Sequence, residues 1–285
     1  MYTPEEVDKA FSWEIESREC LTRTASGELI NVRDKRVLVR TDRELSLGVV
    51  SNRYGVVQPS AMMSLLHAAA GDGLIEYVNG GSFEGGKRIY LQVLLKGANF
   101  DIAGQEHAAY FLLGAHNDGT GSVFWAPTPT RLFCMNQLRI AIDRMVSKLT
   151  LRHTKNAQAR LEQATEVVRR TRGYFGAYTA EAQRLVKQTF SLADMRELTE
   201  TLWPTPKSEA LFEGIKATRA KVVRLFDGEQ LGSSAIQCTK YGALNAVVEY
   251  IDHHQHRKGG EAGRQNALLF GSQTLKQLAY ERLAA

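Results

Sequence analysis

The chain has 285 residues, of which 44% are hydrophobic and 24% charged, and its formal net charge is +5. This composition is typical of a globular protein with one large domain or two small ones. No apolar run is long enough to predict a transmembrane helix, and the polar N-terminus lacks the pattern of a signal peptide. Three widely spaced cysteines predict neither a disulfide framework nor a zinc knuckle. We therefore expect a cytoplasmic protein with no membrane partner.

The first part of the chain reads as an extension, residues 1–45, followed by an α+β core that begins at residue 46. The segment ELINVRDKRVLVRTD alternates apolar and polar residues and predicts a strand pair. The segment LGVVSNRYGVVQP predicts a hairpin with its turn at Ser51–Arg53. Pro59 and Ser60 then predict the start of a helix, with Ser60 as the cap and Gly71 as the stop.

The α+β core, residues 46–155, is expected to hold an antiparallel β-meander and a long basic helix. Strands are predicted over 74–85, 87–97 and 107–118, with turns at Gly80–Gly81 and Gly85–Gly86. A fourth strand, interrupted by Pro127 and Pro129, is expected at an edge or with a bulge. After Asn136, apolar residues spaced by threes and fours up to Leu149 predict a helix.

Residues 156–285 are expected to be helical throughout, which completes an α+β fold with an all-helical C-terminal half. A helical region over 156–190 is expected to break or bend at Gly173 and Gly176. Ser191 to Asp194 resembles a capping box that begins a short helix. A helix is also predicted after Thr205–Pro206, and two more in KYGALNAVVEYIDHH and SQTLKQLAYERLA.

Basic residues gather in one part of the chain. Between residues 131 and 172 there are ten lysines and arginines against three acidic residues, a local charge of +7 in a chain of +5. On the predicted helix, Arg144, Lys148 and Arg152 are spaced by four and would share a face that could follow successive phosphates. Such a stripe is also compatible with a merely solvated helix face. The nucleic-acid-binding candidates are Arg53, Tyr54, Arg131, Arg139, Arg144, Lys148, Arg152 and Lys155.

Aromatic residues beside charge, at Arg53–Tyr54 and Phe124–Trp125, could stack on the bases of a single strand, although core packing is the alternative for each. The glycine-rich segments GGSFEGG and HNDGTGS lack the context of a phosphate or calcium loop and predict turns. Asp252 and His256 could share a metal ion on one helix face, but a helix-end cluster is the alternative. We predict no catalytic residues, no metal and no cofactor.

Four separated motifs occur in an order that resembles a known family: LGVVSNRYGVVQP, HNDGTGSVFWAPTPTRLFCMNQL, RHTKNAQARL and YGALNAVVEYIDHHQHRK. The chain is similar to the phage/plasmid-like proteins that carry a domain of unknown function. This resemblance implies a setting in phages and mobile genetic elements. The order of strands and basic helix also resembles, at the level of fold alone, the single-strand annealing proteins of phage recombination. Those proteins form rings or filaments that hold DNA in a groove.

These observations lead us to expect a non-enzymatic protein that binds single-stranded DNA as a homo-oligomer and assists recombination or replication. Two alternatives stay open: a protein that binds a host protein without catalysis, and a metal-dependent enzyme that uses the Asp252–His256 cluster. Salt-dependent binding to single strands would distinguish the first hypothesis from the other two.

Overall fold

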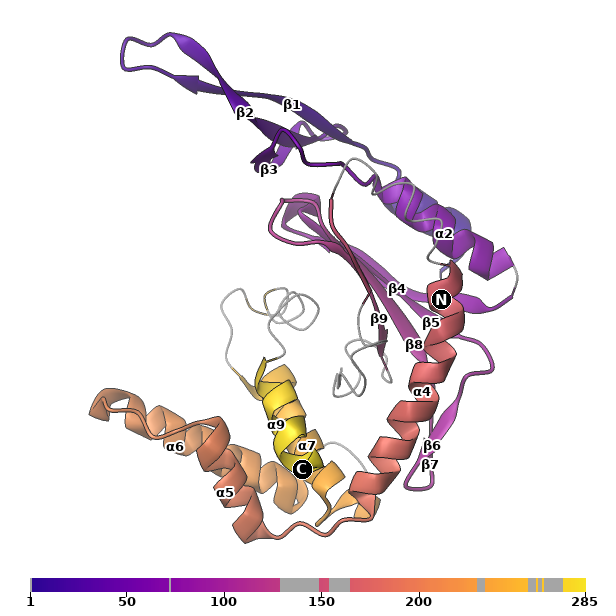
Figure 1. Ribbon diagram of the computed structural model, residues 1–285, viewed down its shortest axis with the longest axis vertical. Helices are drawn as coiled ribbons and strands as arrows, with labels where there is room; N and C mark the ends of the chain where they lie inside the picture. Colours follow the sequence, from indigo (N-terminus) through magenta and orange to yellow (C-terminus); the bar gives the residue numbers. More distant parts are fainter. Residues whose placement is uncertain are drawn as a thin grey trace. The chain divides into compact units, whose positions relative to one another are not determined.

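The chain adopts an α+β fold in which antiparallel sheets are followed by a helical C-terminal part, as predicted (Figure 1). It packs as two compact units. The first comprises Met1–Gly97, Tyr110–Pro127 and Lys148–Arg172, and the second comprises Ala98–Ala109, Thr128–Ser147 and Gly173–Ala285. The computed structural model describes residues 2–71, 73–128, 149–153, 165–229, 234–255, 260, 263 and 274–285.

The first unit contains a three-stranded antiparallel sheet in the order β1-β2-β3, formed by β1 (Ile15–Arg23), β2 (Leu29–Arg40) and β3 (Leu45–Ser51). Figure 1 shows β1 and β2 continuing as a hairpin beyond the end of β3. The predicted hairpin around Ser51–Arg53 was wrong, because β3 pairs backward with β2 and no strand follows it before α2. The turn that reverses the chain lies between Arg40 and Leu45 instead.

Two helices flank these strands in sequence, α1 (Pro4–Ala10) and α2 (Pro59–Gly71). Helix α2 begins at Pro59, whose fixed φ suits the first helical position, so the prediction of Ser60 as the cap was wrong. His67 of α2 links this helix to Asp8 of α1 and to Tyr77, a residue of the larger sheet. Its Nε2 lies 2.7 Å from Asp8 Oδ1, and its Nδ1 lies 2.7 Å from the Tyr77 hydroxyl.

The larger sheet of the first unit has five antiparallel strands in the order β10-β9-β8-β5-β4. The first three strands of the predicted meander are present, as β4 (Ile75–Phe83), β5 (Arg88–Leu95) and β8 (Tyr110–His116). Strand β9 (Val123–Thr128) is completely buried, and β10 (Leu149–Leu151) pairs with it from Val123 to Trp125. Pro127 lies beyond that pairing, so its missing N–H interrupts no described bond with β10.

The tight turn between β4 and β5 is made by Glu84–Gly86, with positive φ at Gly85 and Gly86. Gly80 and Gly81 lie inside β4, so the prediction of a turn there was wrong. The side chain of Arg40 on β2 attaches this turn to the smaller sheet. It lies 4.2 Å above the Trp13 ring, donates to the Gly85 carbonyl at 3.0 Å, and pairs with Asp42 at 2.7 Å.

The second unit contains a small hairpin and most of the helices. Phe100 of the hairpin stacks on Phe175, with ring centroids 5.4 Å apart. Ser191 caps its helix by the predicted capping box with Asp194. The elements are β6 (Phe100–Ile102), β7 (Gln105–His107), α4 (Thr165–Val186), α5 (Leu192–Leu202), α6 (Glu209–Arg224), η3 (Leu225–Glu229), η4 (Ser234–Ile236), α7 (Lys240–Glu249), η5 (Tyr250–His254) and α9 (Thr274–Ala284).

Several helix predictions for this unit need correction. Helix α4 is continuous through Gly173 and Gly176, because a glycine weakens a helix without necessarily ending it. Helix α6 begins at Glu209 rather than at Thr205–Pro206. Leu211, in its first turn, is 62% exposed. No helix in the described residues is long and apolar enough to cross a membrane.

Buried polar groups link the helices of the second unit. The hydroxyls of Tyr178 and Tyr241 lie 3.2 Å apart in the core, and burial raises the pKa of both phenols. Asp252 and Lys276 are each 2% exposed and form an ion pair of 2.5 Å between η5 and α9. Asp252, a possible metal ligand by its sequence pattern, thus has its carboxylate paired with the ammonium of Lys276.

Candidate functional site

Two segments that are distant in sequence meet at one end of the five-stranded sheet. The amide of Gly55, after β3, donates to the carbonyl of His153, after β10, at 3.1 Å. In the reverse direction, His153 Nδ1 lies 3.3 Å from the Gly55 carbonyl oxygen. We call this contact and its neighbours Arg53, Tyr54 and Arg152 the Gly55–His153 junction. It brings together three residues that the sequence analysis proposed for nucleic-acid binding.

The junction is held by a ring stack as well as by hydrogen bonds. The rings of Tyr54 and His153 lie 4.6 Å apart between centroids and 12° from parallel. The Tyr54 hydroxyl donates to the carbonyl of His116 at 3.3 Å. Burial raises the pKa of Tyr54 far above its usual value, and the negative charge of Asp118 acts in the same direction. Tyr54 is therefore an uncharged hydrogen-bond donor at neutral pH.

His153 is also uncharged at neutral pH. Burial lowers the pKa of its imidazole, and this effect outweighs the hydrogen bond to Gly55, which favours the charged form. Because the Gly55 carbonyl can only accept, we assign the ring proton to Nδ1. The neutral ring packs flat on Tyr54 without bringing a buried charge into the sheet end.

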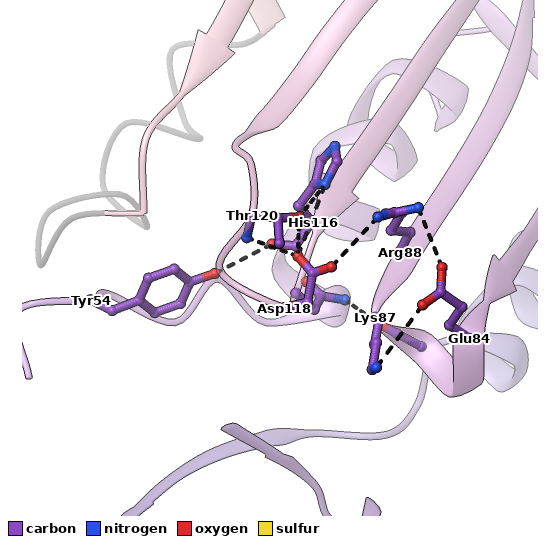
Figure 2. A network of polar contacts seen from close by, with 9 residues as sticks. Tyr54, Glu84, Lys87, Arg88, His116, Asp118 and Thr120 are labelled. Atoms are coloured by element: carbon purple, nitrogen blue, oxygen red, sulfur yellow. Dashed lines mark hydrogen bonds and ion pairs between the residues drawn. The ribbon is translucent and has the colours of Figure 1, made fainter. Parts of the chain in front are cut away.

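Asp118 organises the turn that follows β8, as Figure 2 shows. Its Oδ1 accepts from the Thr120 amide at 2.9 Å and from the Thr120 hydroxyl at 2.6 Å. His116 Nδ1 lies 3.2 Å from the same hydroxyl oxygen. The Asp118 side chain is only 9% exposed, so these bonds replace the water that a carboxylate needs. The turn predicted for HNDGTGS is thus confirmed.

Charges around this turn largely compensate each other. Arg88 Nη1 contacts Glu84 Oε1 at 3.3 Å, and its Nη2 lies 3.9 Å from Asp118 Oδ2. Lys87 Nζ lies 4.0 Å from the other oxygen of Glu84 (Figure 2). Two cations thus face two carboxylates, and this network is close to neutral.

Arg53 and Arg152 differ from this balanced network. Both side chains are exposed, and neither has an ion-pair partner among the described residues. Their positions are fixed by the main chain, because each lies within two residues of the Gly55–His153 hydrogen bonds. The junction therefore contains two exposed arginines that lack ion-pair partners in the described part of the chain, each next in sequence to one ring of a half-buried aromatic pair. Guanidinium groups favour phosphate oxygens, and rings offer a stacking surface for bases.

A close backbone contact positions the turn that follows β8 against strand β3. A Cβ added at Gly48 would lie 2.3 Å from the Asp118 carbonyl oxygen. Only glycine allows that approach, and any larger residue would push β3 and the turn apart. Since Arg53 and Tyr54 directly follow β3, this contact helps to position one half of the junction.

The other predicted binding features, the basic helix and the Phe124–Trp125 pair, are not part of this junction. The predicted helix was wrong at its C-terminal end, because Leu149–Leu151 forms strand β10 by pairing with β9. Arg152 therefore follows a strand and does not share a helix face with Arg144 and Lys148.

Phe124 and Trp125 are each 2% exposed, so they belong to the core and are unable to stack on bases. The candidates outside the described residues are Arg131, Arg139, Arg144, Lys148 and Lys155.

Sequence reasoning missed His153 and His116 as parts of the site. The signal was present in part, since a polar turn directly follows the apolar strand that ends at His116. No local pattern indicates that His153 would face Tyr54. Among the described residues, no group of three histidine, cysteine or acidic side chains is placed to hold a metal ion.

Comparison with protein families identifies a domain that covers most of the chain. The model of a family described as a domain of unknown function, DUF932, matches residues 46–270. The matched range includes β3, the five-stranded sheet and both halves of the Gly55–His153 junction. Neither the curated proteins nor the solved structures contain a match to the chain.

Proposed function

We propose that this chain, which belongs to the DUF932 family, binds single-stranded DNA through the phosphates at the Gly55–His153 junction. One observation supports this most strongly: Arg53 and Arg152 are both exposed and lack ion-pair partners among the described residues. They stand on segments joined by hydrogen bonds in both directions. A phosphodiester can replace water at two such cations and release the counterions that they hold.

The sequence on either side of the junction adds to this proposal. Lys148 directly precedes β10, and Lys155 follows His153 by two residues. Both belong to the basic stretch between residues 131 and 172, as do Arg131, Arg139 and Arg144, and all five lie outside the described residues. In the proposed function they are further candidates for contacts with phosphates. The proposed setting is a phage or mobile genetic element, in which the protein, acting as an oligomer without catalysis, anneals single strands during recombination or replication.

The test is a fluorescence anisotropy titration of a labelled oligothymidylate with the full chain. We expect the double variant Arg53→Ala/Arg152→Ala to bind at least several-fold more weakly. The matched control is Arg196→Ala/Lys207→Ala, which removes the same charge from exposed positions of the second unit. If both double variants lose the same affinity, binding follows net charge and the junction is not the site. Unlabelled duplex as competitor measures the preference for single strands.

Salt dependence gives an independent readout of the same proposal. If five or six of the basic side chains contact phosphates, affinity should fall by about 10²-fold to 10³-fold between roughly 50 and 200 mM salt. The slope should become shallower in Arg53→Ala/Arg152→Ala, because two contacts are lost. A flat salt response would exclude phosphate recognition.

One observation favours a second candidate, the binding of a host protein. Leu211 and Phe212, in the first turn of α6, are 62% and 38% exposed. Adjacent exposed apolar side chains are typical of protein interaction sites. If Leu211→Ser/Phe212→Ser abolishes a phage phenotype in cells while DNA binding is retained, this candidate takes precedence.

A further inference from the structure

The imidazole of His153 has an unusual position in the junction. Its Nδ1 is bonded to the Gly55 carbonyl, and one face of the ring lies on Tyr54. Its Nε2 is buried and has no hydrogen-bond partner among the described residues. A buried polar atom without a hydrogen bond lowers the stability of the fold, so such an atom calls for an explanation, such as a ligand that it binds or a proton that it takes up. The ring is held next to Arg152 by the chain itself.

The surroundings decide which charge state the ring adopts in the free protein. The titratable groups that act on it are Tyr54 from the segment after β3, His116 from the end of β8 and Asp118 from the turn that follows. Asp118 would favour a charged imidazole, but Thr120 already satisfies its Oδ1. The exposed guanidinium of Arg152 adjoins it in sequence. Burial lowers the pKa of His153 most, and the charge of His116 acts in the same direction. Hydrogen bonding to the backbone of Gly55 and His116 and the charge of Asp118 act against them, but burial prevails and the free ring is neutral.

A bound phosphate would reverse this balance. It would bring negative charge to the junction, where Arg53 and Arg152 lie within two residues of the Gly55–His153 hydrogen bonds. A negative charge near the ring favours the imidazolium over the neutral imidazole and acts against the effect of burial. The charged ring keeps its Nδ1 bond to Gly55, gains a proton on Nε2, and remains stacked on Tyr54, where a cation is favoured.

We propose that the binding of single-stranded DNA at the Gly55–His153 junction is coupled to the uptake of one proton by His153. The inference rests on the proposed function and adds its regulation by pH. By linkage, a ligand that binds the protonated form better must bind more tightly as pH falls. His153 is then a residue that tunes affinity, while Arg53 and Arg152 supply the permanent charge.

The test measures oligothymidylate affinity as a function of pH at constant salt, because thymine itself does not titrate near neutrality. For wild type we expect affinity to rise as pH falls, by up to about tenfold per pH unit near pH 6.5. The variant His153→Gln keeps a polar side chain but does not titrate, and its affinity should be independent of pH over that range. Isothermal calorimetry of wild type in two buffers of different ionisation enthalpy should show the uptake of one proton.

His107 serves as the control. Its pKa is also lowered by burial, but it lies in the β6–β7 hairpin of the second unit. His107→Gln should keep the pH dependence of wild type. If His107→Gln removes that dependence, His153 is not the proton acceptor.

The possible failures are distinct. Absence of DNA binding at every pH would overturn the proposed function and this inference with it. DNA binding that is unchanged between pH values, or proton uptake that persists in His153→Gln, would overturn this inference alone. If His153→Gln fails to fold, absence of proton uptake in the calorimetry of wild type still overturns the inference.

Discussion

Tyr54 and His153 stack with their ring centroids 4.6 Å apart, although one follows β3 and the other follows β10. Each ring is preceded in the chain by an exposed arginine that has no ion-pair partner among the described residues. The stack therefore has two roles. It joins the segment after β3 to the segment after β10, and it holds the main chain next to Arg53 and Arg152 in a fixed position. The proposed function depends on the second of these.

Tyr54 allows the two roles to be separated. Tyr54→Phe keeps the stack and loses only the hydrogen bond to the His116 carbonyl. We expect it to lower the free energy of unfolding by about 0.5–1.5 kcal/mol and to leave DNA affinity unchanged. Tyr54→Ala removes the ring, and we expect weaker DNA binding because Arg53 loses its fixed position. Urea unfolding and anisotropy titration measure the two effects, and equal DNA affinity for both variants would contradict the role of the stack.

The buried pair of Asp252 and Lys276 is expected to matter for stability alone. Removing one partner leaves a charge in the core, which costs about 3–5 kcal/mol. Lys276→Met and Asp252→Asn should therefore each lower the midpoint of thermal unfolding, while DNA binding measured well below that temperature stays as in wild type. Should Asp252→Asn instead abolish a metal-dependent activity of a stable protein, the alternative of a metal enzyme would be supported.

Two glycines should respond in opposite directions to the same substitution. Gly173 is exposed within α4 and a Cβ there would meet nothing within 4 Å, so Gly173→Ala should stabilise the protein by about 0.5–1 kcal/mol. Gly48→Ala should destabilise it, because the new methyl would collide with the Asp118 carbonyl. Chemical denaturation of both variants tests this, and a stable Gly48→Ala protein would show that β3 and the turn are not tightly packed.

The pKa shifts of the buried histidines predict how stability varies with pH. Burial lowers the pKa of both His153 and His107 below the unfolded value of about 6.5. Below that pH the unfolded chain binds more protons than the folded one, so the free energy of unfolding falls as pH falls. His153→Gln should make this dependence shallower. Urea unfolding at a series of pH values checks it, and stability that rises on acidification through this range would contradict the assignment.

Much of the fold follows from local sequence. The apolar runs of β4, β5 and β8 and the capping box of Ser191 and Asp194 were predicted correctly, because each depends on neighbouring residues. The helix expected to reach Arg152 failed for the opposite reason. Leu149–Leu151 fits a helical spacing, but its pairing with β9 decides its conformation, and such a contact leaves no local signal.

The candidate site shows the same division. Arg53, Tyr54 and Arg152 were proposed from the sequence, since charge beside an aromatic residue is visible there. Their meeting was not foreseen, because it depends on the pairing of β10 and on the contact between Gly55 and His153. Phe124 and Trp125 are aromatic, as a stacking surface requires, but both are buried. Their burial follows from the position of β9 between β8 and β10, which the local sequence does not show.

The central claim is that single-stranded DNA lies on the Gly55–His153 junction, and photochemical cross-linking tests it most directly. Ultraviolet irradiation of the full chain with an oligothymidylate, followed by mass spectrometry of the digested protein, identifies the peptides that touch the bases. We predict cross-links on the peptides that contain Tyr54 and His153, and their loss in Arg53→Ala/Arg152→Ala. Cross-links confined to other parts of the chain, unchanged in that variant, would contradict the account.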